Sequence, residues 1–249
     1  MNFEVCRLAD SEYHGCIQEN FLLCERNGIL VHPKAPRKGN PWVWRAEFFD
    51  AFPSADLALL ERGYHIAYYS LSDLYGAPQA IDGMKLFYDY LTQAKNLNAR
   101  TELFGFSRGG MYAVNFAARF PEAVNTLYLD APVLDMKSWP AGWGKGCGGK
   151  TEWEQCKAVY RLTDEMARTF KENPIDRVPE LLRHNIPVAL VSGDSDRTVP
   201  YEENGARLAA LYQGAELLLM IKPGADHHPH SLEEPAPIVD FILSHAPQA

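Results

Sequence analysis

The sequence predicts an α/β fold in which a mostly parallel central sheet is flanked by helices, and three observations support this. Short apolar, β-compatible runs alternate with helical runs over most of the chain. The chain has 249 residues, 47% of them hydrophobic and 22% charged, which suits one large folded domain. It contains no internal repeat and no low-complexity segment. We therefore expect a single domain over residues 1–249.

The first part of the chain predicts a hairpin, a helical region and a strand. In CIQENFLLCERNGILVHP, two β runs are joined by Asn27-Gly28, a dipeptide typical of hairpin turns. The run WVWRAEFFDAFPSADLALLERG predicts a helix in two pieces that is broken near Pro53. Residues 64–70, YHIAYYS, then predict a strand.

The rest of the chain alternates between strands and helices, with one long insertion. The expected strands are 101–106, 124–129, 186–192 and 216–221, and the expected helices are 78–94, 108–120, 208–212 and 238–245. Between Leu134 and Ile186 only short helices are expected, over 151–160 and 163–171. Because long insertions between sheet strands often serve as lids, we expect a helical cap over residues 135–185. A structural elaboration that only packs on the sheet edge is the alternative.

Composition and charge exclude several classes of partner. The net charge of −8 at pH 7 disfavours nucleic acid and anionic membrane surfaces. No apolar run reaches the roughly 18–20 residues of a membrane span, and MNFEVCRLAD lacks the pattern of a signal peptide. We expect a soluble protein, cytoplasmic as the sequence stands, with an exported precursor left open. The five cysteines form no C-x-x-C pair, although Cys147 and Cys156 can pair in an exported protein.

The run TELFGFSRGGMYAVNFAARF predicts a strand, a sharp turn and a helix, with Ser107 at the turn. A serine in a G-x-S-x-G turn of this kind has an exposed hydroxyl, which is the arrangement of a nucleophile elbow. An ordinary serine in a tight turn is the alternative. A catalytic role for Ser107 therefore requires a base, an orienting acid and oxyanion donors elsewhere in the chain.

The stretch GDSDRTVP, residues 193–200, supplies a candidate acid. Asp194 and Asp196 follow the strand 186–192, at the carboxyl edge where open α/β sheets place their sites. We expect Asp194 to shape the turn, and Asp196 to reach out and orient an imidazole. A calcium site on the D-x-D pattern is an alternative, but further ligands at loop spacing are missing.

The stretch KPGADHHPHSLEEP supplies a candidate base after the last strand. A neutral imidazole can take a proton from Ser107 and return it to a leaving group. Because consecutive loop side chains point in different directions, only one of His227 and His228 is expected to face Ser107. We expect His230 to bond backbone or substrate. A metal site is a minor alternative, because the loop lacks an H-x-x-x-H pattern and a cysteine partner.

The chain order Ser107, Asp196, His227 is the order of the α/β-hydrolases, and the sequence resembles that superfamily over nearly all its length. GFSRGG resembles the nucleophile elbow, GDSDRTVP the acid turn and PGADHHP the histidine loop. The form G-x-S-R-G-G is similar to prolyl-oligopeptidase-like and bacterial esterase branches. The resemblance implies a triad of Ser107, Asp196 and His227 that requires no cofactor and no metal. His228 stays an alternative base.

The resemblance also implies an oxyanion hole of two backbone N–H groups. The first donor is the N–H of Arg108, the residue after the nucleophile. The second is expected from the loop after NGILV, which reads HPKAPRKG. Where the superfamily has His-Gly this chain has His32-Pro33, and proline has no N–H. We therefore expect Lys34, or alternatively Ala35, as the second donor.

Four side chains are predicted to contact the substrate. Trp44 and Arg45 follow the expected oxyanion loop, and Trp139 and Trp143 lie in the expected cap. Tryptophan faces are common platforms for sugar rings, and arginine suits a carboxylate or hydroxyl-rich group. A carbohydrate-linked ester is therefore the preferred substrate. The alternative is that the tryptophans of WVWRAEFF belong to the core.

Together these features predict a serine hydrolase that cleaves carboxylic esters through an acyl-enzyme. The expected partner is a small-molecule or carbohydrate ester, with no nucleic acid and no membrane. A prolyl-oligopeptidase-like peptidase is one alternative, although the chain has no room for an N-terminal propeller. A non-catalytic binding protein on the same fold is the other, and an intact triad argues against it.

Overall fold

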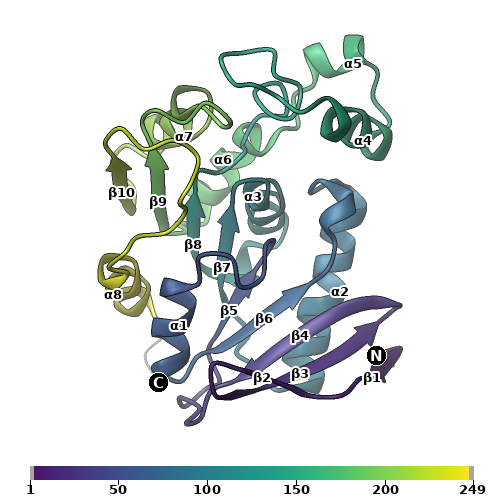
Figure 1. The fold of residues 1–249 in the computed structure, drawn as a ribbon, viewed down its shortest axis with the longest axis vertical. Helices are drawn as coiled ribbons and strands as arrows, with labels where there is room; N and C mark the ends of the chain where they lie inside the picture. The colour runs from purple at the N-terminus through teal and green to yellow at the C-terminus, as the bar shows by residue number, and fades with distance from the viewer. Residues whose placement is uncertain (1–2, 247–249) are drawn as a thin grey trace.

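The computed structural model describes residues 3–246, in which ten strands form one mixed sheet with helices on both faces (Figure 1). The order along the sheet is β1-β3-β4-β6-β5-β7-β8-β9-β10, and β2 pairs with β3. The strands are β1 Val5–Arg7, β2 Ser11–Tyr13, β3 Cys16–Leu23, β4 Arg26–His32, β5 Trp42–Arg45, β6 His65–Tyr69, β7 Thr101–Phe106, β8 Val124–Asp130, β9 Val188–Gly193 and β10 Leu217–Lys222. From β6 to β10 along the sheet every neighbour pairing is parallel, so β7, β8 and β9 end at one edge.

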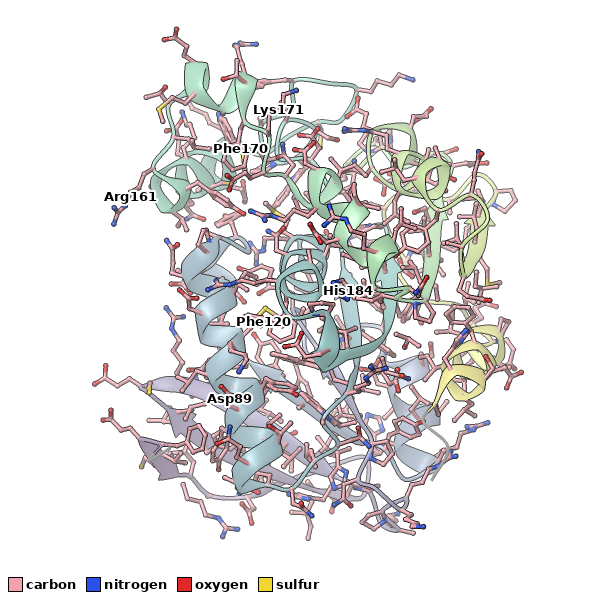
Figure 2. The ribbon with its side chains drawn as sticks, turned by 180° about the vertical axis from the view of Figure 1, so that it is seen from behind. Asp89, Phe120, Arg161, Phe170, Lys171 and His184 are labelled. Carbon is pink, nitrogen blue, oxygen red and sulfur yellow. The ribbon has the colours of Figure 1, made fainter. Side chains whose placement is uncertain are left out.

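Helices cover both faces of the parallel part of the sheet. They are α1 Ser54–Glu61, α2 Pro78–Ala94, α3 Gly109–Arg119, α4 Lys150–Tyr160, α5 Asp164–Thr169, α6 Pro174–Arg183, α7 Gly205–Leu211 and α8 Ala236–His245. Buried apolar residues of α1 and α8 pack together on one face. Those of α2, α3, α6 and α7 belong to the core on the other face. Figure 2, turned by 180° from Figure 1, looks onto this face.

The segment WVWR is the strand β5, so the prediction of a helix there was wrong. β5 lies between β6 and β7 and is parallel to both. All four of its side chains are buried. A parallel strand that is covered on both faces carries a continuous apolar run without alternation, and such a run looks like a buried helix in the sequence. The helical region begins only at Ser54.

The predicted hairpin is present as β3 and β4, but its turn lies elsewhere. Cys24 and Glu25 form the turn, with φ of 47° and 64°. Gly28 lies within β4, opposite Phe21. A Cβ at Gly28 would lie 2.3 Å from the Phe21 ring. The glycine therefore makes room for an aromatic side chain on the neighbouring strand and does not form a turn.

The insertion between β8 and β9 contains three helices, of which α6 was not predicted. α6 packs against α3 in the layer behind the sheet. α4 and α5 lie beyond the edge toward which β7 and β8 point (Figure 1). α4 contacts the short helix Ser72–Leu74 after β6. The other predicted strands and helices occur with ends shifted by a few residues.

Two further observations concern the membrane span that the sequence lacks and the pairing of Cys147 with Cys156. Among residues 3–246, no helix is both long and apolar enough to cross a membrane. Cys147 and Cys156 are free thiols, the first exposed and the second buried. Burial raises the pKa of the Cys156 thiol to about 12.

The close packing of Gly28 against the Phe21 ring leads to a prediction about stability. We expect Gly28→Ala to lower the free energy of unfolding by about 1–3 kcal/mol, because the added methyl group overpacks a buried aromatic ring. Urea unfolding measures this difference. The neighbouring exposed Asn27→Ala is the control and should change stability little. Equal losses in both variants would contradict the overpacking explanation.

Candidate active site

Ser107 lies in a sharp turn between β7 and α3, at the carboxyl edge of the sheet. Its φ is 47°, in the left-handed region that is unfavourable for residues other than glycine. Three backbone hydrogen bonds hold this turn. The Ser107 N–H donates to the Asp130 carbonyl at 2.9 Å, and the Ser107 carbonyl accepts from Gly110 at 3.0 Å and from Val133 at 2.9 Å.

Two glycines allow the neighbouring chain to approach this turn closely. A Cβ at Gly105 would lie 2.8 Å from the Cβ of Ala113, and a Cβ at Gly110 would lie 2.6 Å from the Cβ of Pro132. Larger residues at either position would push α3 or the loop after β8 away from the turn. The glycine spacing seen in the sequence therefore has a packing cause at both positions.

The structure brings Ser107, His227 and Asp196 together. Ser107 Oγ lies 2.9 Å from His227 Nε2, and His227 Nδ1 lies 2.7 Å from Asp196 Oδ2. The other carboxylate oxygen, Asp196 Oδ1, accepts the N–H groups of Thr198 and Val199, both at 2.8 Å. These bonds fix the carboxylate, so Nδ1–H can donate to it while Nε2 accepts from the serine hydroxyl.

Asp194 and His228, which lie close to Asp196 and His227 in the sequence, make different contacts from them. Asp194 accepts the Gly224 N–H at 2.7 Å and the Ser195 hydroxyl at 3.0 Å, so it shapes the turn. His228 is exposed and its ring stacks on Phe52, with a centroid distance of 5.7 Å. Burial together with the neighbouring His230 and His227 lowers the pKa of His228. Of the two adjacent histidines, His227 is the one that faces Ser107.

His230 bonds a carboxylate, whereas the sequence predicted a bond to backbone or substrate. Its Nδ1 lies 2.8 Å from Asp130 Oδ1, and its side chain is 4% exposed. Asp130 Oδ2 accepts the Ser231 N–H at 2.8 Å and the Tyr128 hydroxyl at 3.0 Å. A second buried His–Asp pair thus stands beside the first, with the His227 and His230 ring centroids 4.8 Å apart. The sequence carries no signal for the role of Asp130, which only follows the expected strand 124–129 there.

The prediction of Lys34 as an oxyanion donor was wrong. β4 runs antiparallel to β6, while β5 and β7 run parallel to β6. The chain after β4 therefore leaves the sheet at the edge opposite to Ser107. There the Lys34 Nζ lies 3.1 Å from the position of a Cβ on Gly15. In the sequence the run of β5 resembles a helix, so β4 is the strand from which an oxyanion loop is expected.

The loop after β5, residues 46–52, is the one that reaches the elbow. The Ala46 N–H donates to the Phe104 carbonyl at 3.0 Å, which continues the pairing with β7. The Glu47 Cβ lies 3.2 Å from the position of a Cβ on Gly109, at the start of α3. The Glu47 carboxylate binds the Arg108 guanidinium at 2.8 Å. The loop is therefore held against both the backbone and the side chains of the elbow.

Arg45 is buried beneath this loop, so its predicted contact with substrate was wrong. Its side chain is 1% exposed, and its guanidinium lies 3.9 Å from the centroid of the Phe106 ring. It donates to the carbonyls of Phe48 at 3.0 Å and Ala51 at 2.5 Å, and it pairs with Asp56 at 3.4 Å. A buried strand gives this arginine no route to solvent. Its donors hold the loop instead.

Two of the three predicted tryptophans, Trp44 and Trp143, also differ from the prediction. Trp44 is 1% exposed and packs in the core against Trp42 and Phe116, so it does not reach a substrate. Trp143 contacts Trp153 and Arg168, and lines a hollow separate from the one at Ser107.

Trp139, the third predicted tryptophan, is connected to the elbow through Tyr75. It is partly buried and stacks on Tyr75, at a centroid distance of 6.4 Å. The Arg108 guanidinium lies 5.1 Å from the centroid of the same Tyr75 ring. One side chain, Tyr75, thus lies between Trp139 and Arg108, the residue that follows Ser107.

A cavity of about 170 Å³ opens beside the Ser107 hydroxyl. Its lining combines an apolar wall with the histidines of the last loop, and consists of Phe48, Ala51, Phe52, Phe106, Ser107, His227, His228 and His230. The volume suits a small apolar part of a substrate. The Ser107 hydroxyl and an imidazole are the polar groups that can react with the part of the substrate next to it.

Comparison with known proteins identifies the family and the fold. A model of the prolyl oligopeptidase family matches residues 64–248. No curated protein matches the sequence significantly. Among solved structures, Est1E from Butyrivibrio proteoclasticus is 21% identical with a TM-score of 0.64, over 95% of this chain and 98% of that one.

Other similar structures include esterases and peptidases. The Pyrococcus furiosus esterase Pf2001 is 14% identical with a TM-score of 0.61, over 98% of this chain and 93% of that one. A puromycin-hydrolyzing peptidase from Mycobacterium tuberculosis is 12% identical with a TM-score of 0.63, over 87% of this chain but only 36% of that one. At these identities the likeness concerns the fold.

The buried position of Arg45 makes a prediction about the loop of residues 46–52. We expect Arg45→Lys to lower the free energy of unfolding by about 2–4 kcal/mol, because an ammonium group cannot serve both carbonyls and the Phe106 face. Urea unfolding measures the loss, and hydrogen exchange should be faster at the amides of residues 46–52. Arg62→Lys, at an exposed residue directly after α1, is the control. Unchanged exchange in this loop would contradict the role given to Arg45.

Proposed function

The chain belongs to the prolyl oligopeptidase family, and on this premise we propose that it cleaves small carboxylic esters through an acyl-enzyme on Ser107. Its fold is the α/β-hydrolase fold, and it is a hydrolase of the serine type. The observation that carries the proposal is the continuous line of hydrogen bonds from Ser107 through His227 to Asp196. The line starts at a strained turn and ends on a fixed carboxylate, as acyl transfer requires.

In the proposed reaction Ser107 is the nucleophile, His227 acts as base and then as acid, and Asp196 orients His227. The Ser107 oxygen attacks the ester carbonyl while its proton passes to His227 Nε2. Asp196 accepts the Nδ1–H and stabilises the imidazolium that forms. The tetrahedral intermediate then collapses, and the proton passes from His227 to the leaving alcohol. A water molecule, activated by the same imidazole, releases the acid and restores Ser107.

For the oxyanion we propose the N–H groups of Arg108 and Glu47. Arg108 directly follows the nucleophile at the start of α3, where N–H groups are unpaired. The Glu47 nitrogen lies 3.7 Å from the position of a Cβ on Gly109. Within residues 3–246, neither amide donates to a protein acceptor. Two free N–H groups next to the same turn suit the charge that develops on the carbonyl oxygen.

The cavity at the elbow favours an ester over a peptide as substrate. It holds about 170 Å³ beside Ser107 and has an apolar wall, which suits a short acyl chain better than a peptide. The family name keeps peptide substrates as the second candidate.

For the alcohol part of the ester, we propose contact with the face of Trp139. This residue lies in the segment 135–185, which we propose as a cap, and it stacks on Tyr75 near Arg108. A sugar alcohol suits an aromatic face. The proposal of a carbohydrate-linked ester now depends on Trp139, because Trp44 and Arg45 are buried in the core.

The proposal predicts covalent chemistry at Ser107. We expect Ser107→Ala to lower kcat on p-nitrophenyl acetate by about 10⁴-fold or more, because nucleophile and base act as a unit. Intact mass after fluorophosphonate treatment should rise by one adduct, which is absent in the variant. Ser195→Ala, in the neighbouring acid turn, is the control and should keep both activity and adduct. An adduct on another residue would exclude Ser107 as nucleophile.

The choice between ester and peptide predicts a clear order of substrates. We expect kcat/KM to be highest for p-nitrophenyl esters of short acids, to fall as the acyl chain outgrows the cavity, and to be far lower for aminoacyl-p-nitroanilides. Parallel steady-state assays on the two series measure this order. Faster turnover of the anilides would make the protein a peptidase and leave the role of Ser107 intact.

A further inference from the structure

The histidine loop has a second feature that acyl transfer does not use. His227, His228 and His230 each offer a ring nitrogen, and these three atoms lie within 4.8 Å of one another. The three ring centroids are 4.8–4.9 Å apart. Only one of the rings is needed as a base. Three neighbouring imidazoles are also the protein ligand set of a common class of zinc sites.

The two buried histidines are already oriented as metal ligands. Nδ1 of His227 bonds Asp196 at 2.7 Å, and Nδ1 of His230 bonds Asp130 at 2.8 Å. A metal-ligating histidine usually donates its other N–H to a carboxylate, which fixes the tautomer and leaves a lone pair for the metal. In both residues this leaves the Nε2 lone pair for a metal, which in His227 must replace the hydrogen bond from Ser107. The His230–Asp130 pair has no role in the proposed acyl transfer, so it is an observation independent of the triad.

The site is accessible and needs little movement to close around an ion. The three histidines line the cavity beside Ser107, through which an ion can enter. Zinc bonds of about 2.0–2.1 Å in a tetrahedral site place the ligand nitrogens about 3.4 Å apart. His228 is exposed, so its ring can leave the stacking contact with Phe52 and turn toward the other two. The buried carboxylates of Asp130 and Asp196, each behind one histidine, complement a divalent cation.

We propose that His227, His228 and His230 bind one zinc ion, and that bound zinc reversibly blocks hydrolysis. The blockade follows from the atom involved. His227 Nε2 is the hydrogen-bond partner of the Ser107 hydroxyl, and its single lone pair cannot bind zinc and accept the serine proton at the same time. Water or the Ser107 hydroxyl completes the fourth position. The blockade rests on the proposed function, whereas the binding of zinc does not.

The test separates binding from inhibition. Isothermal titration of the whole protein with zinc at fixed pH should give one site. His228→Gln and His230→Gln should each weaken the affinity by about tenfold or more. His228→Gln changes an exposed side chain, so the test does not depend on the folding of the buried variant. The control is His184→Gln, an exposed histidine at the end of α6 on the rear face (Figure 2), which should bind zinc as the unaltered protein does.

Ester hydrolysis gives the second measurement. Zinc should inhibit the unaltered protein over the concentration range in which it binds, and EDTA should restore the rate. Magnesium, which prefers oxygen ligands, should not inhibit. Inhibition in His228→Gln, measured relative to its own uninhibited rate, should need about tenfold more zinc.

The outcomes distinguish the two proposals. Zinc that binds equally well to both glutamine variants, or that does not bind at micromolar concentration, overturns the site. Binding that depends on the histidines without any effect on hydrolysis overturns the blockade. Binding that depends on the histidines in a protein that hydrolyses neither esters nor anilides supports the site and refutes the proposed function.

Discussion

The strained turn at Ser107 is the constraint around which the rest of the site is arranged. A left-handed backbone at a serine costs on the order of 1–3 kcal/mol and persists only where neighbours hold it. One of those neighbours is Asp130, whose carbonyl accepts the Ser107 N–H and whose carboxylate bonds His230 and the Ser231 N–H. The end of β8 therefore fixes Ser107 through its backbone and the histidine loop through its side chain.

Arg45 has the corresponding task on the other side of the turn. Its guanidinium lies against Phe106, directly before Ser107, and holds the carbonyls of Phe48 and Ala51. A fully buried cation is costly unless every donor is satisfied, and here Asp56 supplies the compensating charge. The loop that approaches the elbow is therefore fixed by the core rather than by solvent-exposed contacts. That rigidity is what an oxyanion hole needs, because its donors must be in place before charge develops.

The fold predicted from the sequence was largely correct where a local pattern determines it. Alternating strands and helices, the elbow at Ser107 and the later strands all carry such patterns. It failed at β5, because a strand buried on both faces has no alternation. It also failed at Gly28, whose role depends on a ring in the neighbouring strand. The error at β5 also caused the error at Lys34, because without β5 the loop after β4 was expected to supply the oxyanion donor.

The sequence by itself determined the order of Ser107, Asp196 and His227 and the position of each just after a strand. These are local features, because a parallel sheet brings the ends of β7, β9 and β10 to one edge whatever lies between them. Only the tertiary structure decided that Arg45 is a buried support, that β5 leads to the elbow, and that Asp130 pairs with His230. Asp130 and His230 are 100 residues apart, and their contact follows from the order of strands and the packing of the last loop, for which neighbouring residues carry no signal.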